Sequence, residues 1–570
     1  MAAPVRLTAR PADVISRTSA RARHRLASAS VLATAGCIVA WLIGSRVSYV
    51  PMWDGFVYAE AINDAVAAPS LEGLRLAGHA SQAYAALAVA LQAIAPGSVW
   101  PLLVLNAALL VTACVGFHRL LALAFPEPLR SVERALLTAA FALQPSLLAA
   151  VVQPGLDLPV VPGIIWCTVF MLERRWVATI LVGIVTAFTK ESAVLLYAVL
   201  LATYGVWTFI RTTGSIRVRF VEVLRLAPLA VPGIVFGLYL LWRKQSAVAG
   251  EPVVWNAGTA MINQSLVRQL LVPRIDRYLA SFLAMMGILN FAWIATAFTA
   301  AGAVVYTRRL VRAGTARLAA RELINGASSV VGFLVLFTGA AVFALTRLAT
   351  YANSRYVLPI IALLFLLCYA SLVTLVRSPR IREGILGAFA VLLMISSVRT
   401  IDPVSRALYG TFAVGDRELL RMTSITRECC GSGRDQLVYN LEFTTLERLT
   451  SDALESVSAR DSTVIVIPDS TDWFIATRVD PVSHRRTVTR DGAVSPLVIE
   501  DDSLRKADLL VTRAVFIALP NAGADRALAA LSERYVVGPE RRHRRGPYAL
   551  SVYPLAPRLS ADASRGRLQP

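Results

Sequence analysis

Charged residues are scarce in this chain, at 16% of its 570 residues, whereas a soluble globular protein carries about 25%. Hydrophobic residues make up 56%. Several apolar runs reach or approach the roughly 20 residues that a helix needs to cross a bilayer. These proportions exclude an ordinary soluble enzyme and indicate a polytopic membrane protein with an attached soluble part.

Cysteine is also rare, with six residues in the whole chain. Four of them lie in apolar runs and are interpreted as packing residues: Cys37, Cys114, Cys167 and Cys368. Cys429 and Cys430 are adjacent in the polar C-terminal part, where a redox pair stays open as an alternative. No metal-type spacing is present. No cofactor is therefore implied with certainty, although the carboxylates discussed below leave a divalent metal open.

Acidic residues are few relative to basic ones, 37 against 57, which gives a net charge of +20. The arginines cluster in short segments between apolar runs, as positive-inside topology produces. Nucleic-acid binding would need a basic face on a folded domain, so we expect no nucleic-acid partner. The long basic stretch before residue 28 is not typical of a cleavable signal peptide, and we interpret residues 1–27 as a cytoplasmic tail before a retained first helix.

Eleven membrane spans follow from the apolar runs, in a multi-pass protein of the inner (plasma) membrane. The stretch 80–95 is apolar but only about 16 residues long, and counting it as a span would place the later arginine-rich loops outside. We therefore interpret it as a re-entrant or interfacial helix, with the N-terminus inside and the C-terminus outside. The predicted spans are about 28–48, 98–118, 135–152, 158–172, 177–189, 193–210, 226–242, 279–306, 326–348, 357–376 and 385–399.

The composition changes near residue 400, where apolar runs give way to short patterned segments. Residues 462–469 and 513–520 are predicted to be buried strands, 523–535 has helical periodicity, and 548–555 alternates like a strand. We expect a small extracytoplasmic α/β domain over 401–556. The chain ends, 1–20 and about 557–570, are expected to be disordered.

The outer loops of this topology hold the polar residues that are candidates for chemistry. Asp54, in the stretch MWDGFVYAE, is either a helix N-cap or a general base that Trp53 and Phe56 partly desolvate. Both readings are compatible. Glu60 and His79 belong to the same loop, and His79 either orients a ligand, binds a metal or only caps the 80–95 helix.

The remaining candidates come from three later outer loops. Asp157, in QPGLDLP, precedes a predicted span, so an N-cap is again the simpler interpretation. Lys190 and Glu191, in FTKESA, form a charged pair between two apolar runs, either as a salt bridge or with Lys190 as an anion ligand. Arg355, in NSRYVLP, is either an interfacial anchor or a phosphate ligand.

These motifs, in this order, resemble the GT-C membrane glycosyltransferases. The resemblance covers about residues 28–400 and rests on MWDGFVYAE, a His-x-x-x-x-Tyr stretch at His79, QPGLDLP, ERRW, TKESA and RYVLP. It is nearest to the branch of the protein O-mannosyltransferases and the lipid A aminoarabinose transferase. The chain departs from that pattern where His79-Ala80-Ser81 replaces His-Pro-Pro and where Asp54-Gly55 replaces Asp-Glu.

The resemblance implies an inverting transfer of a sugar from a polyprenyl-phosphate-linked donor to an acceptor hydroxyl at the outer membrane face. It assigns Asp54 as general base, Asp157 as a second catalytic carboxylate, and Lys190 and Arg355 as ligands of the donor phosphate. Glu60, His79 and Glu191 are supporting candidates. The acceptor is left open among protein, lipid and polysaccharide.

Two other functions remain as alternatives. A transporter or flippase of lipid-linked substrates would have broken helices at mid-membrane or an inverted repeat, and the sequence shows neither. A non-catalytic relative that binds envelope partners is the second alternative, and an intact Asp54 argues against it.

Overall fold

The computed structural model describes most of the helical region and part of the C-terminal region. The described residues are 11–45, 54–125, 131–246, 291–312, 329–348 and 354–396, then short segments between 413 and 500, and 514–518, 522–545 and 548–558. The outer loop predicted at 243–278 beyond residue 246, the part of the span predicted at 279–306 before residue 291, and Cys429 and Cys430 lie outside the described residues.

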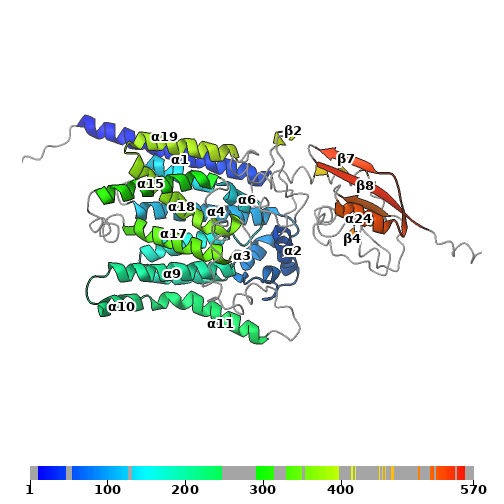
Figure 1. The fold of residues 1–570 in the computed structure, drawn as a ribbon, viewed down its shortest axis with the longest axis horizontal. Coiled ribbons are helices and arrows are strands. Elements are labelled where there is room, and N and C mark those ends of the chain that lie inside the picture. Colours follow the sequence, from blue (N-terminus) through cyan, green and yellow to red (C-terminus); the bar gives the residue numbers. More distant parts are fainter. Residues whose placement is uncertain are drawn as a thin grey trace, which may run out of the picture.

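The helical region is a bundle whose long helices run side by side (Figure 1). Its helices are α1 (Pro11–Gly44), α2 (Asp54–Ala67), α3 (Gln82–Gln92), α4 (Trp100–Ala124), α5 (Ser131–Ala142), α6 (Pro145–Val151), α7 (Val160–Leu172), α8 (Trp176–Ala187), α9 (Glu191–Arg211), α10 (Ile216–Leu224), α11 (Val231–Ser246), α15 (Ala292–Arg312), α17 (Ser329–Leu348), α18 (Leu358–Leu375) and α19 (Pro379–Ser396). Three short 3₁₀ helices interrupt the order: η1 (Leu76–Gly78), η2 (Ala227–Ala230) and η5 (Ser354–Val357).

The bundle has the composition of a multi-pass membrane protein. Four described helices are long and apolar enough to cross a bilayer, or up to six segments if each of two bent helix pairs is one span. Their outward side chains are apolar too: on α4, Val111 is 62% and Val115 55% exposed, which suits a surface covered by lipid. The count of eleven spans is supported only to this extent.

Two of the predicted spans are bent, which corrects the expectation of unbroken helices. The span predicted at 135–152 consists of α5 and α6, bent by 59°. Pro145 lacks the N–H that would continue α5, and the side chain of Gln144 accepts a bond from the amide of Leu147, which caps α6. The span predicted at 226–242 contains η2 and most of α11, and α10 precedes it at an angle of 46°. We expected residues 211–225, which include α10, to be a loop.

The short apolar stretch after the first loop forms the helix that we predicted. α3 has 11 residues, about 16 Å at 1.5 Å per residue, which is too short to span a bilayer. Its first turn is tied to neighbouring helices, because Ala83 donates its amide to the carbonyl of Phe188 at 2.9 Å and Gln82 bonds the hydroxyl of Tyr239 at 2.6 Å. We expected residues 1–20 to be disordered, and this was wrong in part, because α1 already begins at Pro11.

The core of the bundle is a continuous apolar cluster that joins α4, α5, α7, α9, α17 and α18. Among the four candidate spans α18 is the most buried, with residues such as Leu358, Leu366 and Leu372 at 1% exposure or less. Close helix crossings use small residues: Gly302 of α15 lies so near Ser371 of α18 that a Cβ at position 302 would collide with that side chain.

The turn that joins α9 to α10 lies at the end of the bundle away from α2 and α3 (Figure 1), and Arg211, Arg217 and Arg219 belong to this part of the chain. Toward the C-terminal end of α18, the buried carboxylate of Glu133 accepts bonds from Arg382 at 2.8 Å and from the hydroxyl of Tyr369 at 2.9 Å. Arg119 bonds Glu173 at 2.6 Å after α7 ends. The orientation that positive-inside reasoning gives to these two ends stays a prediction.

The C-terminal region contains a six-stranded sheet in the order β4-β3-β5-β8-β6, with β7 also paired to β8. Its elements are β3 (Val464–Ile467), β4 (Val498–Glu500), β5 (Ala514–Ala518), α24 (Ala522–Leu531), β6 (Tyr535–Val537), β7 (Arg541–Arg545) and β8 (Tyr548–Pro557); a separate pair joins β1 (Ala413–Val414) to β2 (Arg417–Glu418). Apolar residues of α24 pack on Val466 and Phe516. The strands and helix predicted within 462–555 are therefore present, while β4, β6 and β7 were not predicted.

Candidate functional site

Four of the predicted site residues form one chain of ion pairs. Arg355 donates from Nη1 to Oδ2 of Asp54 at 2.6 Å, and its Nε lies 3.6 Å from Oδ2 of Asp157. The other oxygen of Asp157, Oδ1, pairs with a second cation, because Nζ of Lys190 donates to it at 2.5 Å. The structure thus brings together two carboxylates and two cations that are up to 301 residues apart in sequence.

Each of these side chains stands at or just before the start of a helix. Asp54 opens α2, Asp157 precedes α7, Lys190 immediately precedes α9, and Arg355 is in η5, which leads into α18. The N-terminus of a helix presents unpaired N–H groups and a partial positive charge, so a group of such ends favours anions. The grouped helix starts therefore favour the carboxylates of Asp54 and Asp157, and they would favour a phosphate group for the same reason.

Burial differs along the ion-pair chain. The side chains of Lys190 and Asp157 are 8% and 13% exposed, and Arg355 is 19% exposed. Asp54 is 39% exposed. Asp54 is therefore the carboxylate that an incoming substrate can reach, while Asp157 is enclosed between two cations.

Buried contacts fix the loop that carries Asp157. Asn106 of α4 donates its side-chain amide to the carbonyls of Val151 and Gln153, at 3.1 and 2.8 Å. The N-terminus of α2 packs against the same loop at Gly55, where a Cβ would lie 2.8 Å from Oε1 of Gln153 and 2.9 Å from the carbonyl oxygen of Pro154. This contact gives a physical reason for glycine where the related sequence pattern has Asp-Glu.

Gly55→Ala is expected to lower the free energy of unfolding by about 1–3 kcal/mol, because the added methyl group overpacks the contact with a backbone carbonyl. The matched control is Gly233→Ala in α11, where a Cβ meets nothing within 4 Å and helix propensity favours alanine by about 0.5–1 kcal/mol. Thermal unfolding of both variants in the same detergent measures the difference. Equal stabilisation of the two would contradict the close approach of α2 to Pro154.

His79 and Glu191 form a second polar pair beside the first. Nδ1 of His79 lies 2.9 Å from Oε2 of Glu191, and Oε1 of the same carboxylate accepts the amide of Ala80 at 2.8 Å. Glu191 is the first residue of α9 and directly follows Lys190. The pair therefore joins the first loop to the helix whose start positions Lys190.

Tyr58 is a functional candidate that the sequence analysis missed. It lies on α2 one turn after Asp54, is 6% exposed, and its ring meets that of His79 edge-on at 6.2 Å between centroids. Burial raises the pKa of its hydroxyl well above the usual value, and the charges of Asp54 and Asp157 raise that pKa further. Tyr58 is consequently a neutral hydrogen-bond donor between the ion-pair chain and the polar pair.

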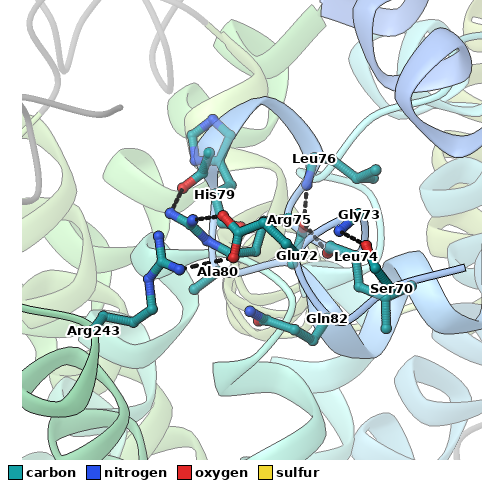
Figure 2. Close-up of polar contacts among 12 residues, drawn as sticks. Ser70, Glu72, Gly73, Leu74, Arg75, Leu76, His79, Ala80, Gln82 and Arg243 are labelled. Atoms are coloured by element: carbon teal, nitrogen blue, oxygen red, sulfur yellow. Dashed lines mark hydrogen bonds and ion pairs between the residues drawn. The ribbon is translucent and has the colours of Figure 1, made fainter. Parts of the chain in front are cut away.

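The loop before His79 is tied to α11 by a further ionic group (Figure 2). Glu72 accepts from Arg75 on one oxygen and from Arg243 of α11 at 2.8 Å on the other. Arg75 also donates to the carbonyl of Gly78 at 3.2 Å. Inside the loop, the hydroxyl of Ser81 accepts the amide of Leu76 at 2.8 Å, so several side chains fix the backbone that leads to His79.

Glu60 is placed apart from this arrangement. It follows Asp54 by six residues on α2, which puts the two side chains about 120° apart around the helix axis at 100° per residue. Glu60 is partly buried there. Its supporting role stays a prediction.

The described residues offer no ready metal site. Within those ranges, no three His, Cys, Asp or Glu side chains gather in a group that would hold a metal ion. His79 instead pairs with Glu191, and Asp54 and Asp157 pair with cations. The sequence left a divalent metal open, and the described residues provide no set of ligands for it. The metal therefore stays a prediction.

Comparison with solved structures identifies the type of fold. Residues along the whole bundle superpose on ArnT from Cupriavidus metallidurans in the apo state, with a TM-score of 0.52, 13% sequence identity and coverage of 92% of this chain and 97% of that one. The same protein bound to undecaprenyl phosphate gives a TM-score of 0.51 at the same identity and coverage.

The fold of this chain is therefore similar to that of ArnT, which agrees with the fold that the resemblance in the sequence implied. No protein-family model matches the chain, and no curated protein sequence matches it. At 13% identity the likeness establishes the fold and leaves the reaction to be argued from the site.

Proposed function

We propose that this protein is an integral membrane glycosyltransferase. It moves a sugar from a polyprenyl-phosphate-linked donor to an acceptor hydroxyl on the outer face of the membrane, with inversion at the anomeric carbon. The observation that supports this most is the ion-pair chain of Asp54, Arg355, Asp157 and Lys190, assembled from four separate helix starts within a GT-C fold. ArnT has been solved with undecaprenyl phosphate bound, which makes a polyprenyl phosphate the natural leaving group to consider.

Asp54 acts as the general base in this mechanism. It is the more exposed of the two aspartates, and a carboxylate that accepts a guanidinium hydrogen bond is ionised, as a proton acceptor must be. It removes the proton of the acceptor hydroxyl as that oxygen attacks the anomeric carbon. The bond between the anomeric carbon and the phosphate oxygen breaks, and the lipid phosphate leaves with its electron pair.

Arg355 and Lys190 stabilise the charge that develops on the leaving phosphate. A guanidinium carries five N–H groups, so Arg355 can hold Asp54 and a phosphate oxygen together. Asp157 is enclosed by both cations, at 2.5 Å from Lys190 and 3.6 Å from Arg355, and keeps them in place. We therefore assign Asp157 to positioning the two cations, and Asp54 to proton transfer.

Glu191 and His79 support the position of Lys190, because Glu191 directly follows Lys190 at the start of α9 and bonds His79. The carboxylate of Glu191 binds the first loop through His79 and Ala80, and this attachment keeps the segment before α3 and the start of α9 together. The inner-membrane location, with the N-terminus cytoplasmic and the C-terminal sheet extracytoplasmic, remains part of the proposal.

Tyr58→Phe is expected to lower the specificity constant for transfer about 2–10-fold, because it removes one neutral hydrogen bond to the substrate, worth about 0.5–1.5 kcal/mol. Folding should not change, since phenylalanine keeps the ring against His79. The control is Tyr197→Phe, whose hydroxyl bonds the backbone carbonyl of Leu229 at 2.8 Å; that variant should lose stability and keep its transfer rate. Unchanged kinetics in Tyr58→Phe would remove Tyr58 from the site.

The direct test of the function is transfer of radiolabelled sugar from a panel of polyprenyl-phosphate donors into envelope fractions. Membranes that contain the protein are compared with membranes that lack it, and the labelled fraction identifies protein, lipid or polysaccharide as acceptor. Transfer that depends on the protein supports a glycosyltransferase. Equal labelling with and without the protein, across the panel, would contradict it.

A transporter of lipid-linked substrates is the second candidate, because the structure contains the bent helix pairs α5–α6 and α10–α11. Transporters use broken helices to build sites at mid-membrane. Here the two carboxylates and two cations stand at helix starts on one end of the bundle, which suits chemistry at the membrane surface better. A donor labelled in both the sugar and the phosphate distinguishes the two functions, because a transferase separates the labels and a transporter moves them together.

A further inference from the structure

Strand β7 of the C-terminal sheet carries an unusual concentration of positive charge. Its five residues are Arg541, Arg542, His543, Arg544 and Arg545, and all four arginines are exposed. Among the described strands, β7 pairs only with β8, so it forms an edge of the sheet. Like charges this close together repel one another, and a bound group of opposite charge relieves that repulsion.

The arginines of β7 point alternately to the two faces of the sheet, because side chains alternate along a strand. Arg542 lies opposite Ser551 of β8 and Arg544 opposite Ala549. Ser551 is in turn the partner of Ala518, and Ala518 belongs to the cluster that α24 covers. Arg542 and Arg544 therefore stand on the α24 face.

The other face of β7 is partly occupied by the chain itself. Arg545 pairs with Asp452 at 2.9 Å, and Nε2 of His543 lies 3.1 Å from the hydroxyl of Ser456. The acidic residue just before the strand, Glu540, accepts the hydroxyl of Ser551 at 2.5 Å. Asp525 of α24 also lies near Tyr553, on the face of Arg542. These acidic groups offset part of the charge, and the four arginines of the strand stay in excess.

Protection of a sheet edge against aggregation is one reason for charge on an edge strand. That purpose is usually served by lysine, whereas every basic residue here except His543 is arginine, whose planar group binds phosphate or carboxylate with two parallel hydrogen bonds. Residues on one face of a strand repeat about every 6.8 Å. A linear partner that lies along this edge can be held from both faces, whereas a flat bilayer would meet one.

We propose that β7 is a binding surface for an extended anionic glycan, one that carries phosphate or carboxylate groups at intervals. The choice of a glycan over another linear polyanion rests on the proposed function, which puts the sheet in a compartment with sugar polymers. The binding itself requires no transfer activity, so the two proposals can fail separately.

The test is binding of fluorescent polygalacturonate and of phosphorylated dextran to the full-length protein in zwitterionic nanodiscs, followed by fluorescence anisotropy. We expect saturable binding to both anionic polymers, none to neutral dextran, and an affinity that falls steeply with salt, as counterion release requires. The double variant Arg542→Gln/Arg544→Gln should lose about tenfold or more in affinity, and Arg542→Lys/Arg544→Lys should lie between the two.

The matched control removes the same charge elsewhere. Arg377→Gln/Arg380→Gln changes two exposed arginines beside α19 and should bind the polymers like the unchanged protein. Equal affinity in all variants would overturn the proposal, as would tighter binding of single-stranded nucleic acid than of either glycan. Absence of binding by the intact protein, together with aggregation of the β7 glutamine variant, would show that the arginines only protect the edge.

Discussion

Replacing Asp54 by asparagine is expected to lower sugar transfer about 10²–10⁴-fold, the usual contribution of a positioned general base. Asparagine fills nearly the same volume and can still bond Arg355, whose Nη1 now lies 2.6 Å from Oδ2. It cannot accept the proton of the acceptor hydroxyl. The loss should therefore appear in the turnover number at saturating donor, with little change in thermal stability.

The matched control for this experiment is Asp64→Asn, an exposed aspartate on the same helix. It makes the same chemical change at a distance from the ion-pair chain and should leave transfer unchanged. Rates would be measured with proteins at equal abundance in the same membranes. Full transfer by Asp54→Asn would show that another group takes the proton.

Replacing Asp157 by alanine is expected to destabilise the fold by about 3–5 kcal/mol and to abolish transfer. The change leaves Lys190, whose side chain is 8% exposed, as a buried cation without its carboxylate, and breaking one partner of a buried pair has this cost. Arg355 loses its neighbour at 3.6 Å as well. Thermal or denaturant unfolding in detergent gives the stability, and transfer is measured separately.

A double variant separates the structural role of this pair from its chemical role. Asp157→Leu/Lys190→Met removes both charges with apolar groups of similar size, a change that often restores or improves stability. We expect the double variant to regain most of the lost stability and to stay inactive, because the phosphate ligand is missing. Recovery of transfer together with stability would show that the pair is only a structural salt bridge.

The sequence carried enough information to select four residues that the structure brings together, for reasons that are local. Apolar length and arginine placement set the topology, and the loops left on the outer side contained Asp54, Asp157, Lys190 and Arg355. The same reasoning separated α3 from the spanning helices, because an 11-residue helix cannot cross a bilayer. The patterns of Val464–Ile467 and Ala514–Ala518 likewise predicted their strands.

The pairing within the site could not be predicted. Nothing local links Arg355 to Asp54 over 301 residues, and an aromatic residue such as Tyr58 near a membrane surface is typical of interfacial anchors. The bend before Pro145 has a local signal, since proline ends a helix, but a run of apolar residues on both sides hides it. β7 was missed because four arginines give no alternation of apolar and polar residues.

The glycine after Asp54 shows how a departure from a family pattern can be explained by structure. In the sequence, Asp54-Gly55 stands where the pattern that the chain resembles has Asp-Glu. In the structure, the space for a side chain at position 55 is filled by Gln153 and Pro154, on the loop that leads to Asp157. The change is thus compatible with an intact site.

The central claim is that the bond between sugar and lipid phosphate breaks at the Asp54–Arg355–Asp157–Lys190 site. The most direct measurement uses purified protein in proteoliposomes with a donor labelled by ³H in the sugar and by ³²P in the phosphate. We predict that ³H moves to the acceptor while ³²P stays in the lipid as polyprenyl phosphate, and that Asp54→Asn stops this separation. Movement of both labels together across the bilayer, with the sugar still attached, would contradict the account and identify a transporter.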